Sequence, residues 1–421
     1  MLESLSTVQL KSRRDKVLVW LLLISVIILQ LAISHSDTTL VPSFVNKLLP
    51  PLNYALAGGI FLFVNWRQRI GMNTFGKLFL GFSLFILSVV DVNPGYKATG
   101  LLLCLQMIAF PFCEDQVLLK AMHLYRKYLV FIAAFGILAC LDLFVLHTLP
   151  HKIVPYYSGE TAFYVDYFLS YIIWERDYTM FRLCGTFNEP GIFGTTMAIM
   201  LVMDKINLRK WSNIILLIAC CLTFSMACFT ILAIGAALHA FKNTKYLVAL
   251  AVVVVFGGAV VSQSEDKNVQ HLVSRFEFDS SKGKMKGDNR TPFAFLKAEQ
   301  VFKDSGHEMF GMGKGYLAGK GVTNFSSYKT IYIEFGYLGF LLTTGCFLLF
   351  SLLTIKHNKN AFIYWLCAGI TIYSRNSAYD ISNLFLMYAG ILAVLWCDQQ
   401  EITNGKRENH MNIRCKFDAV V

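Results

Sequence analysis

The feature of this chain that most constrains its fold is a series of long apolar runs separated by short polar segments. A helix needs about 20 apolar residues to cross the hydrocarbon core of a bilayer, and somewhat shorter runs are tolerated. Runs of this kind fall at about residues 17–34, 52–66, 76–92, 99–115, 128–148, 190–204, 211–224, 226–241, 246–262, 332–355, 361–374 and 383–397. They predict an all-α fold, a polytopic membrane helix bundle with about 12 transmembrane helices.

Composition also favours a membrane protein. Only 15% of the residues are charged and 55% are hydrophobic, whereas a soluble protein carries roughly 25% charged residues. The net charge of +11 does not indicate a nucleic-acid partner, because the Lys and Arg residues mostly flank the apolar runs, where they report orientation. Most cysteines lie in or beside these runs, and Cys184, in an expected external loop, has no external partner for a disulfide.

The positions of Lys and Arg predict which parts of the chain face the cytoplasm, since short loops rich in these residues stay inside. Residues 211–241 are long for one span and short for two, and we interpret them as two shallow helices that turn near Ser225, with a single crossing as the alternative. The two-helix interpretation places inside the basic residues Lys242, Lys245, Lys356, Lys359, Lys406, Arg407, Arg414 and Lys416. Both chain termini are therefore expected in the cytoplasm.

Two expected external segments are much longer than the other connections. We predict one integral-membrane domain over residues 1–421, with a first long loop at 149–189, a second long loop at 263–331 and a cytoplasmic tail at 398–421. Loops longer than about 15 residues are uncommon unless they are functional or disordered, and neither loop has a low-complexity composition. The function is expected to reside in these two loops.

Short surface helices are expected within the long loops. Thr291 and Pro292 precede FAFLKAEQVFKDS and are typical of a helix start, with Thr as the N-cap and Pro at the first helical position. This helix is expected to lie on the membrane surface or over the bundle. The first loop is rich in Tyr, Phe and Trp, which form either an interfacial aromatic belt or a platform that stacks on sugar rings or covers a lipid.

Arg182 begins the stretch RLCGTFNEPGIFG, where glycines and a proline crowd the point at which the chain re-enters the expected membrane. An arginine at that depth is costly unless it is paired. Glu189 is its local candidate partner, which would make the two residues a structural pair. The alternative is a clamp for an anionic substrate, with the Gly and Pro residues allowing the backbone to approach the ligand.

The second loop contains Arg290 and then FGMGKGYLAGKG, in which Gly311, Gly313 and Gly315 surround Lys314. Backbone N–H groups of glycines beside a lysine can cradle phosphate, and a flexible turn is the alternative. The spacing differs from that of a nucleotide-binding P-loop, so no nucleotide is expected here.

Taken in order, these motifs resemble the O-antigen polymerase and ligase superfamily of bacterial surface-polysaccharide assembly. The resemblance rests on R-x-x-G-T-F-x-E-P-G-x-F-G from Arg182, on Arg290 with the helix after it, on G-x-G-K-G at 311–315, and on E-F-G-Y-L-G from Glu334 to Gly339. Together these motifs cover about half of the chain, and the other spans are similar only in number and length.

The resemblance implies a membrane glycosyltransferase, a polysaccharide polymerase. Such an enzyme transfers a glycan chain from undecaprenyl pyrophosphate onto a new lipid-linked repeat unit at the periplasmic face, without a cofactor, metal or nucleotide sugar. It also implies a multi-pass protein of the bacterial inner (plasma) membrane, surrounded by membrane lipids, with a chain-length regulator protein as a partner. The product would be O-antigen of lipopolysaccharide, capsule or exopolysaccharide.

A pyrophosphate leaving group needs positive charge where negative charge develops, and preorganised arginines can supply that charge. Arg182 and Arg290 are the predicted pyrophosphate-binding residues. Lys314 and Arg375 are predicted to assist, and a boundary arginine that contacts lipid headgroups is the alternative for Arg375.

Glu189 and Glu334 are the candidate catalytic residues that would deprotonate the acceptor hydroxyl, because both are carboxylates within the matching motifs. Glu334 has a structural alternative, as a helix cap or as the ion-pair partner of Lys329 or Lys314.

Two other functions are weighed against polymerisation. Ligases of the superfamily carry a histidine shortly before the E-x-G segment, where this chain has Phe325-Ser326-Ser327. A flippase for lipid-linked oligosaccharide would share many spans, but transporters usually keep short external connections and ionisable residues at mid-membrane. Polymerisation is therefore the preferred function.

Overall fold

The computed structural model describes residues 5, 8–31, 43–66, 105–106, 108–155, 162–175, 180–240, 270, 278–279, 284–285, 293–313, 315–322, 328–373 and 381–418. The helices are α1 (Arg13–Gln30), α2 (Ser43–Phe63), α5 (Asp115–Leu141), α6 (Pro190–Met203), α7 (Trp211–Leu222), α8 (Met226–Ala240), α11 (Phe293–Asp304), α12 (Tyr316–Gly319), α13 (Lys329–Phe340), α14 (Cys346–Leu353), α15 (Lys359–Tyr373) and α16 (Ile381–Asp418). The strands are β1 (Lys152–Pro155), β2 (Ala162–Asp166), β3 (Tyr171–Glu175), β4 (Met180–Gly185), β5 (Phe278–Asp279) and β6 (Lys284–Met285).

The prediction of an all-α bundle with about 12 transmembrane helices is wrong. Among the residues that the structure describes, two helices are long and apolar enough to cross a membrane, Asp115–Leu146 and Ile381–Thr403. A four-stranded antiparallel sheet also stands where the first long loop was expected to carry only short surface helices.

The physical reason for this error lies in the length and burial of the shorter apolar helices. α6, α7 and α8 have 14, 12 and 15 residues, and at 1.5 Å per residue even the longest covers about 22 Å of a hydrocarbon core roughly 30 Å thick. α6 is buried along nearly its whole length and packs against α7, α8 and α15. Its sequence is apolar because it forms the centre of a protein core, and hydropathy alone does not distinguish that burial from contact with lipid.

Other sequence-predicted elements are found. The interpretation of 211–241 as a helical pair is confirmed, since α7 and α8 are separated by a turn at Thr223–Ser225. The surface helix of the second long loop is confirmed as α11, although its predicted cap, Thr291 and Pro292, lies outside the described residues. The apolar runs at 76–92 and 246–262, and residues 99–104 and 107 of the run at 99–115, also lie outside the described residues.

Strands β1 to β4 form an antiparallel meander in chain order. Alternate side chains point to opposite faces of a sheet, and Val165, Ile172 and Leu183, which pair across β2, β3 and β4, join the main core beside α5. The other face carries a small buried cluster of Val154, Tyr164, Tyr171, Ile173 and Cys184. The sequence of this region is rich in aromatic and β-branched residues, which suit a pleated and half-buried surface.

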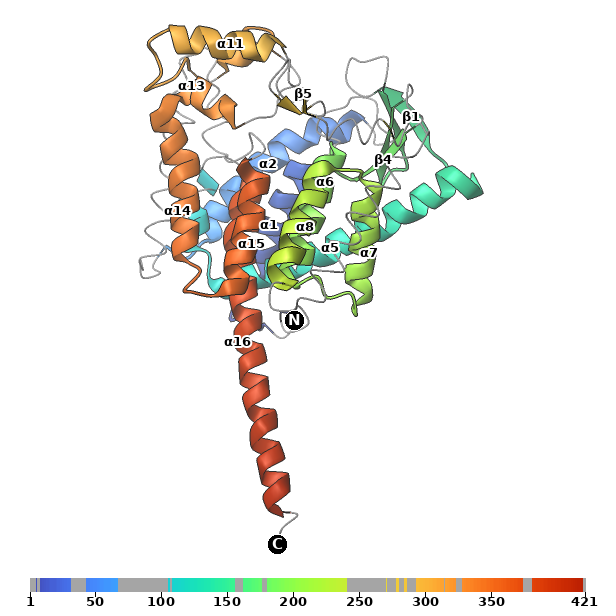
Figure 1. Cartoon of the computed structure of the whole chain (residues 1–421), viewed down its shortest axis with the longest axis vertical. Coiled ribbons are helices and arrows are strands. Elements are labelled where there is room, and N and C mark those ends of the chain that lie inside the picture. The colour runs from blue at the N-terminus through green and yellow to red at the C-terminus, as the bar shows by residue number, and fades with distance from the viewer. Residues whose placement is uncertain are drawn as a thin grey trace.

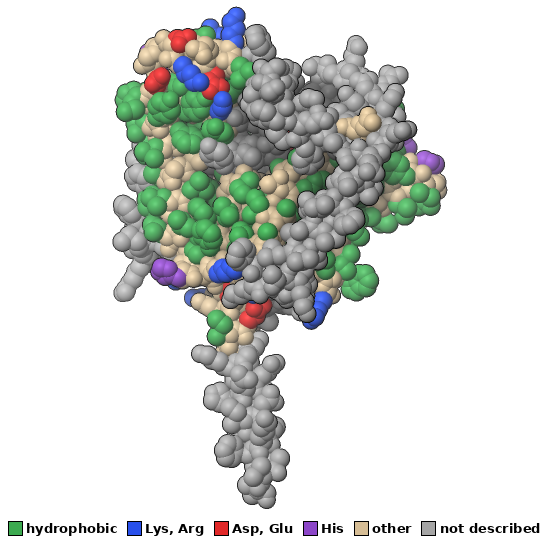
Figure 2. Space-filling view, in the orientation of Figure 1, with side chains coloured by type: hydrophobic (Ala, Val, Ile, Leu, Met, Phe, Trp, Pro, Cys, Tyr) green, Lys and Arg blue, Asp and Glu red, His purple; other side chains and the backbone are tan. Residues whose placement is uncertain are grey.

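The sheet and α11 lie at one end of the molecule, and the long helix α16 projects from the other end (Figure 1). The two segments expected to be long external loops therefore approach the same end of the fold. The helical body between the two ends carries exposed apolar side chains, including Trp20, Leu62, Phe131, Leu138, Trp211, Leu341, Leu349 and Leu353. Figure 2 shows hydrophobic side chains over the middle of one face, with charged side chains at its upper end and lower edge.

Candidate functional site

Arg182 lies on β4, half-buried, where the sheet meets the helical body. Its guanidinium Nε donates to the carbonyl oxygen of Thr223 at 3.2 Å. Thr223 is the C-cap of α7, and the last carbonyls of a helix carry partial negative charge that a cation stabilises. Arg182 therefore joins the sheet to the turn between α7 and α8. A guanidinium has five N–H donors, so it can hold this carbonyl and an anion at the same time.

Glu189 stands at the N-cap position of α6, in extended backbone conformation, without a side-chain capping bond. The side chain is half-buried, and its backbone carbonyl accepts from the N–H groups of Ile192 and Phe193 at 3.2 and 3.3 Å. The backbone thus places Glu189, the predicted catalytic residue, at the junction between the sheet and α6.

The charges of Arg182 and Glu189 both act on the buried thiol of Cys184. Burial is the main reason why the pKa of Cys184 is raised well above its usual range, while Arg182 opposes the rise and Glu189 adds to it. The two residues of the predicted arginine motif therefore lie close to one buried side chain. The free thiol of Cys184 is kept protonated and unreactive there.

The glycines of the same stretch make close contacts within the chain rather than leaving space for a ligand. Gly185 has a φ of +57°, and a Cβ atom there would lie 2.8 Å from Ile132 Cγ2 and from Phe193 Cζ. At Gly194 a Cβ atom would lie 2.7 Å from Thr223 Oγ1. Packing therefore explains the glycines at 185 and 194, because neighbouring side chains occupy the space beside them.

The glycines of the second motif are also used for packing. The N–H groups of Met312 and Gly313 donate to the carbonyls of Ile333 and Glu334, both at 2.9 Å. In return, the N–H groups of Tyr337 and Leu338 donate to Glu308 and Met309 at 2.9 and 3.2 Å. The segment 308–313 thus pairs with the segment 333–338, which contains the first five residues of the E-F-G-Y-L-G motif.

This pairing requires glycine at two facing positions. A Cβ atom at Gly311 would lie 2.4 Å from the carbonyl oxygen of Glu334, and one at Gly336 would lie 2.3 Å from that of Met309. Gly336 also has a φ of +70° and interrupts α13. The Gly313 N–H is donated within the protein, so it is not part of a phosphate cradle in this conformation.

Glu334 is half-buried on α13, two residues before this interruption. α13 lies at the same end of the molecule as the sheet that carries Arg182 (Figure 1). The other predicted site residues, Arg290, Lys314 and Arg375, lie outside the described residues. The structure therefore places Arg182 on β4 and Glu189 at the start of α6, on either side of the junction between the sheet and α6, with Glu334 at the same end of the fold (Figure 1).

A charged cluster around Glu299 was not predicted. The Glu299 carboxylate is 7% exposed and receives Lys329 Nζ at 2.8 and 2.9 Å, Lys303 Nζ at 3.2 Å and the Tyr332 hydroxyl at 2.5 Å. Lys329, predicted as a possible partner of Glu334, is therefore an ion-pair partner of Glu299. Only the spacing of Glu299 and Lys303 on one helix could have indicated this cluster, since Lys329 is 30 residues away.

The Glu299 cluster attaches α11 to α13. Phe295, Ala298 and Phe302 of α11 pack in one small core with Ile333 of α13. Burial raises the pKa of Glu299, but hydrogen bonds from Lys329, Tyr332 and Lys303 outweigh it and leave the pKa lowered. The cluster therefore stabilises α11 above the unfolded-state pKa of about 4.3, and this stabilisation is lost as the pH falls through the lower folded-state pKa.

We expect Glu299→Gln to weaken the attachment of α11 by about 1–3 kcal/mol, since charged hydrogen bonds are replaced by neutral ones. Hydrogen exchange of α11 amides, corrected for intrinsic rates, should be faster in the variant at pH 7. The difference from wild type should shrink in acid. Lys297→Gln, a charge change at an exposed position of α11, serves as the control. Equal protection in wild type and Glu299→Gln would contradict the assignment.

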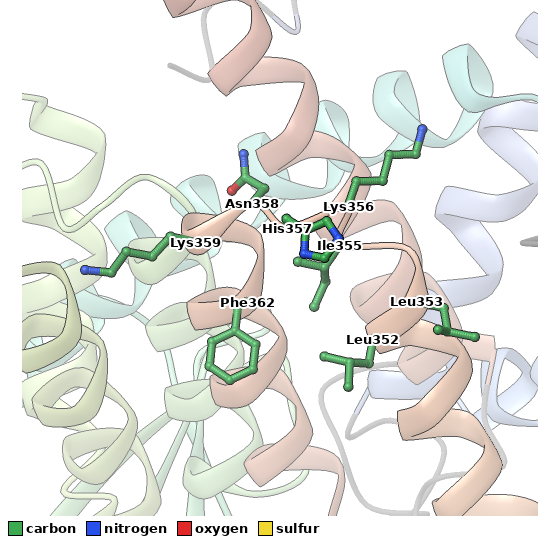
Figure 3. Close-up of a pocket in the computed structure, with 8 residues that line it drawn as sticks. All are labelled: Leu352, Leu353, Ile355, Lys356, His357, Asn358, Lys359 and Phe362. Atoms are coloured by element: carbon green, nitrogen blue, oxygen red, sulfur yellow. The ribbon is translucent and has the colours of Figure 1, made fainter.

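A pocket of about 460 Å³ lies at the turn between α14 and α15 (Figure 3), toward the end from which α16 projects (Figure 1). It contains none of the predicted site residues. Within the ranges that the structure describes, no group of three or more His, Cys, Asp or Glu side chains is placed to hold a metal ion.

Comparison with known proteins assigns this chain to no family. A scan against protein-family models finds no match to this chain, and a search of curated proteins finds none either. The function is therefore inferred from the sequence motifs and from the geometry around Arg182.

Proposed function

We propose that this chain is a membrane glycosyltransferase that polymerises a bacterial surface polysaccharide. It would transfer a glycan chain from undecaprenyl pyrophosphate onto a new lipid-linked repeat unit. The observation that carries the proposal is that Arg182 and Glu189 are both half-buried at the sheet–α6 junction, where the Thr223 carbonyl holds the Arg182 guanidinium at 3.2 Å. A cation for the leaving group and a carboxylate for the acceptor are the two charges that the reaction needs.

The proposed location is the bacterial inner membrane, with both termini in the cytoplasm. Two observations support this location. The helical body carries exposed apolar side chains. The helix Asp115–Leu146 is apolar, and only 39% of its most apolar 18-residue stretch is buried. Large exposed apolar surfaces on a protein mark contacts with a membrane or with a partner. The sheet and α11 lie at the end opposite to the projecting α16 (Figure 1) and would face the periplasm.

In the proposed reaction, the acceptor hydroxyl oxygen attacks the anomeric carbon of the donor glycan. A new C–O glycosidic bond forms, the bond from the anomeric carbon to the pyrophosphate oxygen breaks, and undecaprenyl pyrophosphate leaves. Glu189 takes the hydroxyl proton, with Glu334 as the other candidate base. Arg182, with the predicted Arg290, Lys314 and Arg375, would stabilise the negative charge that develops on the pyrophosphate.

The rigidity of the Arg182 side chain also suits this role. Preorganised charges stabilise a transition state without a reorganisation cost at the moment of reaction. The bond from Arg182 Nε to the Thr223 carbonyl and the packing of Gly185 and Gly194 fix the position from which the guanidinium acts.

We expect Arg182→Gln to abolish polymerisation in cells that lack the wild-type gene. Glutamine keeps an N–H donor for the Thr223 carbonyl but removes the positive charge. The variant therefore tests the electrostatic role of Arg182 while the hydrogen bond to Thr223 is retained. The surface-polysaccharide ladder on a gel should collapse to a single repeat unit, as in the deletion strain, while the protein is present in membranes at the wild-type amount. Arg182→Lys should restore part of the ladder.

Arg209→Ala, which changes an exposed arginine on the turn between α6 and α7, is the matched control and should leave the ladder unchanged. Other patterns would replace the proposal. Full-length polymer that stays on undecaprenyl pyrophosphate would indicate a ligase, and loss of all attached repeats would indicate a flippase. A normal ladder in the deletion strain would exclude a role in this polysaccharide.

A further inference from the structure

The turn between α14 and α15 forms a pocket with a basic rim and an apolar wall. Its volume, about 460 Å³, lies within the range of small-ligand sites. The lining residues are Leu352, Leu353, Ile355, Lys356, His357, Asn358, Lys359 and Phe362. Figure 3 shows Lys356 and Lys359 extending to opposite sides of the turn, with His357 between them and with Phe362 and Leu352 farther along the two helices.

The backbone of this turn is held in an uncommon conformation. Lys356 and His357 have φ angles of 51° and 60°, a left-handed region that side chains other than glycine and asparagine rarely adopt. The next residue secures the turn, because Asn358 Oδ1 accepts the Ala361 N–H at 2.8 Å and Asn358 Nδ2 donates to Asp398 Oδ2 at 2.8 Å. The lysines and the histidine are therefore presented by a turn anchored to α16.

The nearby carboxylate is already satisfied by other residues. Asp398 also receives Asn360 Nδ2 at 2.9 Å and Lys205 Nζ at 3.1 Å. Lys356 and Lys359 are exposed, and neither has an ion-pair partner within the described part of the chain. The rim therefore carries two uncompensated positive charges beside His357.

The wall of the same pocket is exposed and apolar. Leu352 is 36% exposed, Leu353 55% and Phe362 43%. In Figure 2, charged side chains lie at the lower edge of the face whose middle is covered by hydrophobic side chains. A ligand that fits both parts has an anionic group attached to a hydrocarbon chain.

We propose that this pocket binds an anionic phospholipid, with the phosphate at the 356–359 turn and an acyl chain along Leu352, Leu353 and Phe362. The proposal rests on the proposed membrane location but not on the polymerase activity. Basic residues near a bilayer surface attract anionic lipids, and the exposed apolar wall favours a lipid over free phosphate. The site would face the leaflet at the α16 end of the protein, away from Arg182.

The test is native mass spectrometry of the purified full-length protein in mild detergent, titrated with phosphatidylglycerol or phosphatidylcholine. Wild type should bind phosphatidylglycerol at least about tenfold more tightly, since each lysine adds to the attraction for anionic lipid. Lys356→Gln/Lys359→Gln should remove this preference and leave the binding of phosphatidylcholine unchanged. Lys356→Arg/Lys359→Arg should keep the preference, which excludes misfolding as the cause.

Lys297→Gln/Lys320→Gln removes two exposed lysines, one on α11 and one directly after α12, and should behave as wild type. α12 packs with α11, which lies at the other end of the molecule (Figure 1). Equal binding of the two lipids by wild type, or an unchanged preference in the Gln double variant, would overturn the proposal. Displacement of phosphatidylglycerol by an equal concentration of inorganic phosphate would show a free-anion site instead. Arg182→Gln should keep the lipid preference, so failure of the proposed polymerase function is seen separately.

Discussion

Gly336→Ala is expected to destabilise the protein by about 2–6 kcal/mol, a large effect for the addition of a single methyl group. Alanine at a φ of 70° and a ψ of −176° is strained by about 1–3 kcal/mol, because this region of backbone conformation is essentially restricted to glycine. The added Cβ would also lie 2.3 Å from the Met309 carbonyl oxygen and 2.5 Å from Phe310 N. These are backbone atoms that cannot move aside as a flexible side chain can, and overpacking of this kind costs about 1–3 kcal/mol more.

Chemical unfolding of the purified protein in detergent would measure the loss, and hydrogen exchange would show it first in the paired segments 308–313 and 333–338. Gly306→Ala is the matched control, since Gly306 has a φ of +71° but no atom within 4 Å of its Cβ position. Its loss should be only the strain, about 1–2 kcal/mol. Equal losses in the two variants would show that the close backbone contact at Gly336 is absent.

Asp204→Ala is expected to cost about 3–5 kcal/mol, because it removes one partner of a buried ionic network. The Asp204 side chain is fully buried and lies 3.3 Å from Arg126 Nη2 and 3.2 Å from Lys210 Nζ. Asn213 Nδ2 also donates to Asp204 Oδ2 at 3.0 Å. Arg126, whose side chain is 12% exposed, would keep a buried charge without its carboxylate.

The measurement is again equilibrium unfolding, and Asp304→Ala is the control, an exposed carboxylate on α11 whose loss should cost well under about 1 kcal/mol. The double variant Asp204→Leu/Arg126→Met should recover much of the loss, because replacing a whole buried ion pair by apolar residues is often nearly neutral. If the single variant is as stable as wild type, Asp204 does not link α5 to the turn between α6 and α7.

Local features could be predicted from the sequence. The positions of α6, α7 and α8 follow the apolar runs, and the turn at Thr223–Ser225 falls where the run is too long for one helix. The start signal and spacing of α11 predict it, and Phe295, Ala298 and Phe302 form its buried face. Each of these features depends on residues within a few turns of one another, which is the range over which pattern and propensity act.

Features that depend on distant residues could not be predicted in this way. The sequence suggests Lys329 as a partner for Glu334, five residues away, but it does not indicate the ion pair of Lys329 with Glu299, 30 residues away. The glycines at 311–315 resemble a phosphate cradle in sequence, yet Gly311 faces Gly336 across a backbone pairing. A glycine needed for a ligand and a glycine needed for packing are identical in sequence.

The sequence by itself determined where several of the helices form, which segments of the chain are apolar, and which charged residues accompany the glycine motifs. The tertiary structure decided which apolar runs are core and which are surface, because burial depends on what packs around a helix and not on its composition. It also decided that Arg182 binds the carbonyl end of α7 and that the first long loop contains a sheet. Both outcomes follow from contacts between segments that only the folded chain brings together.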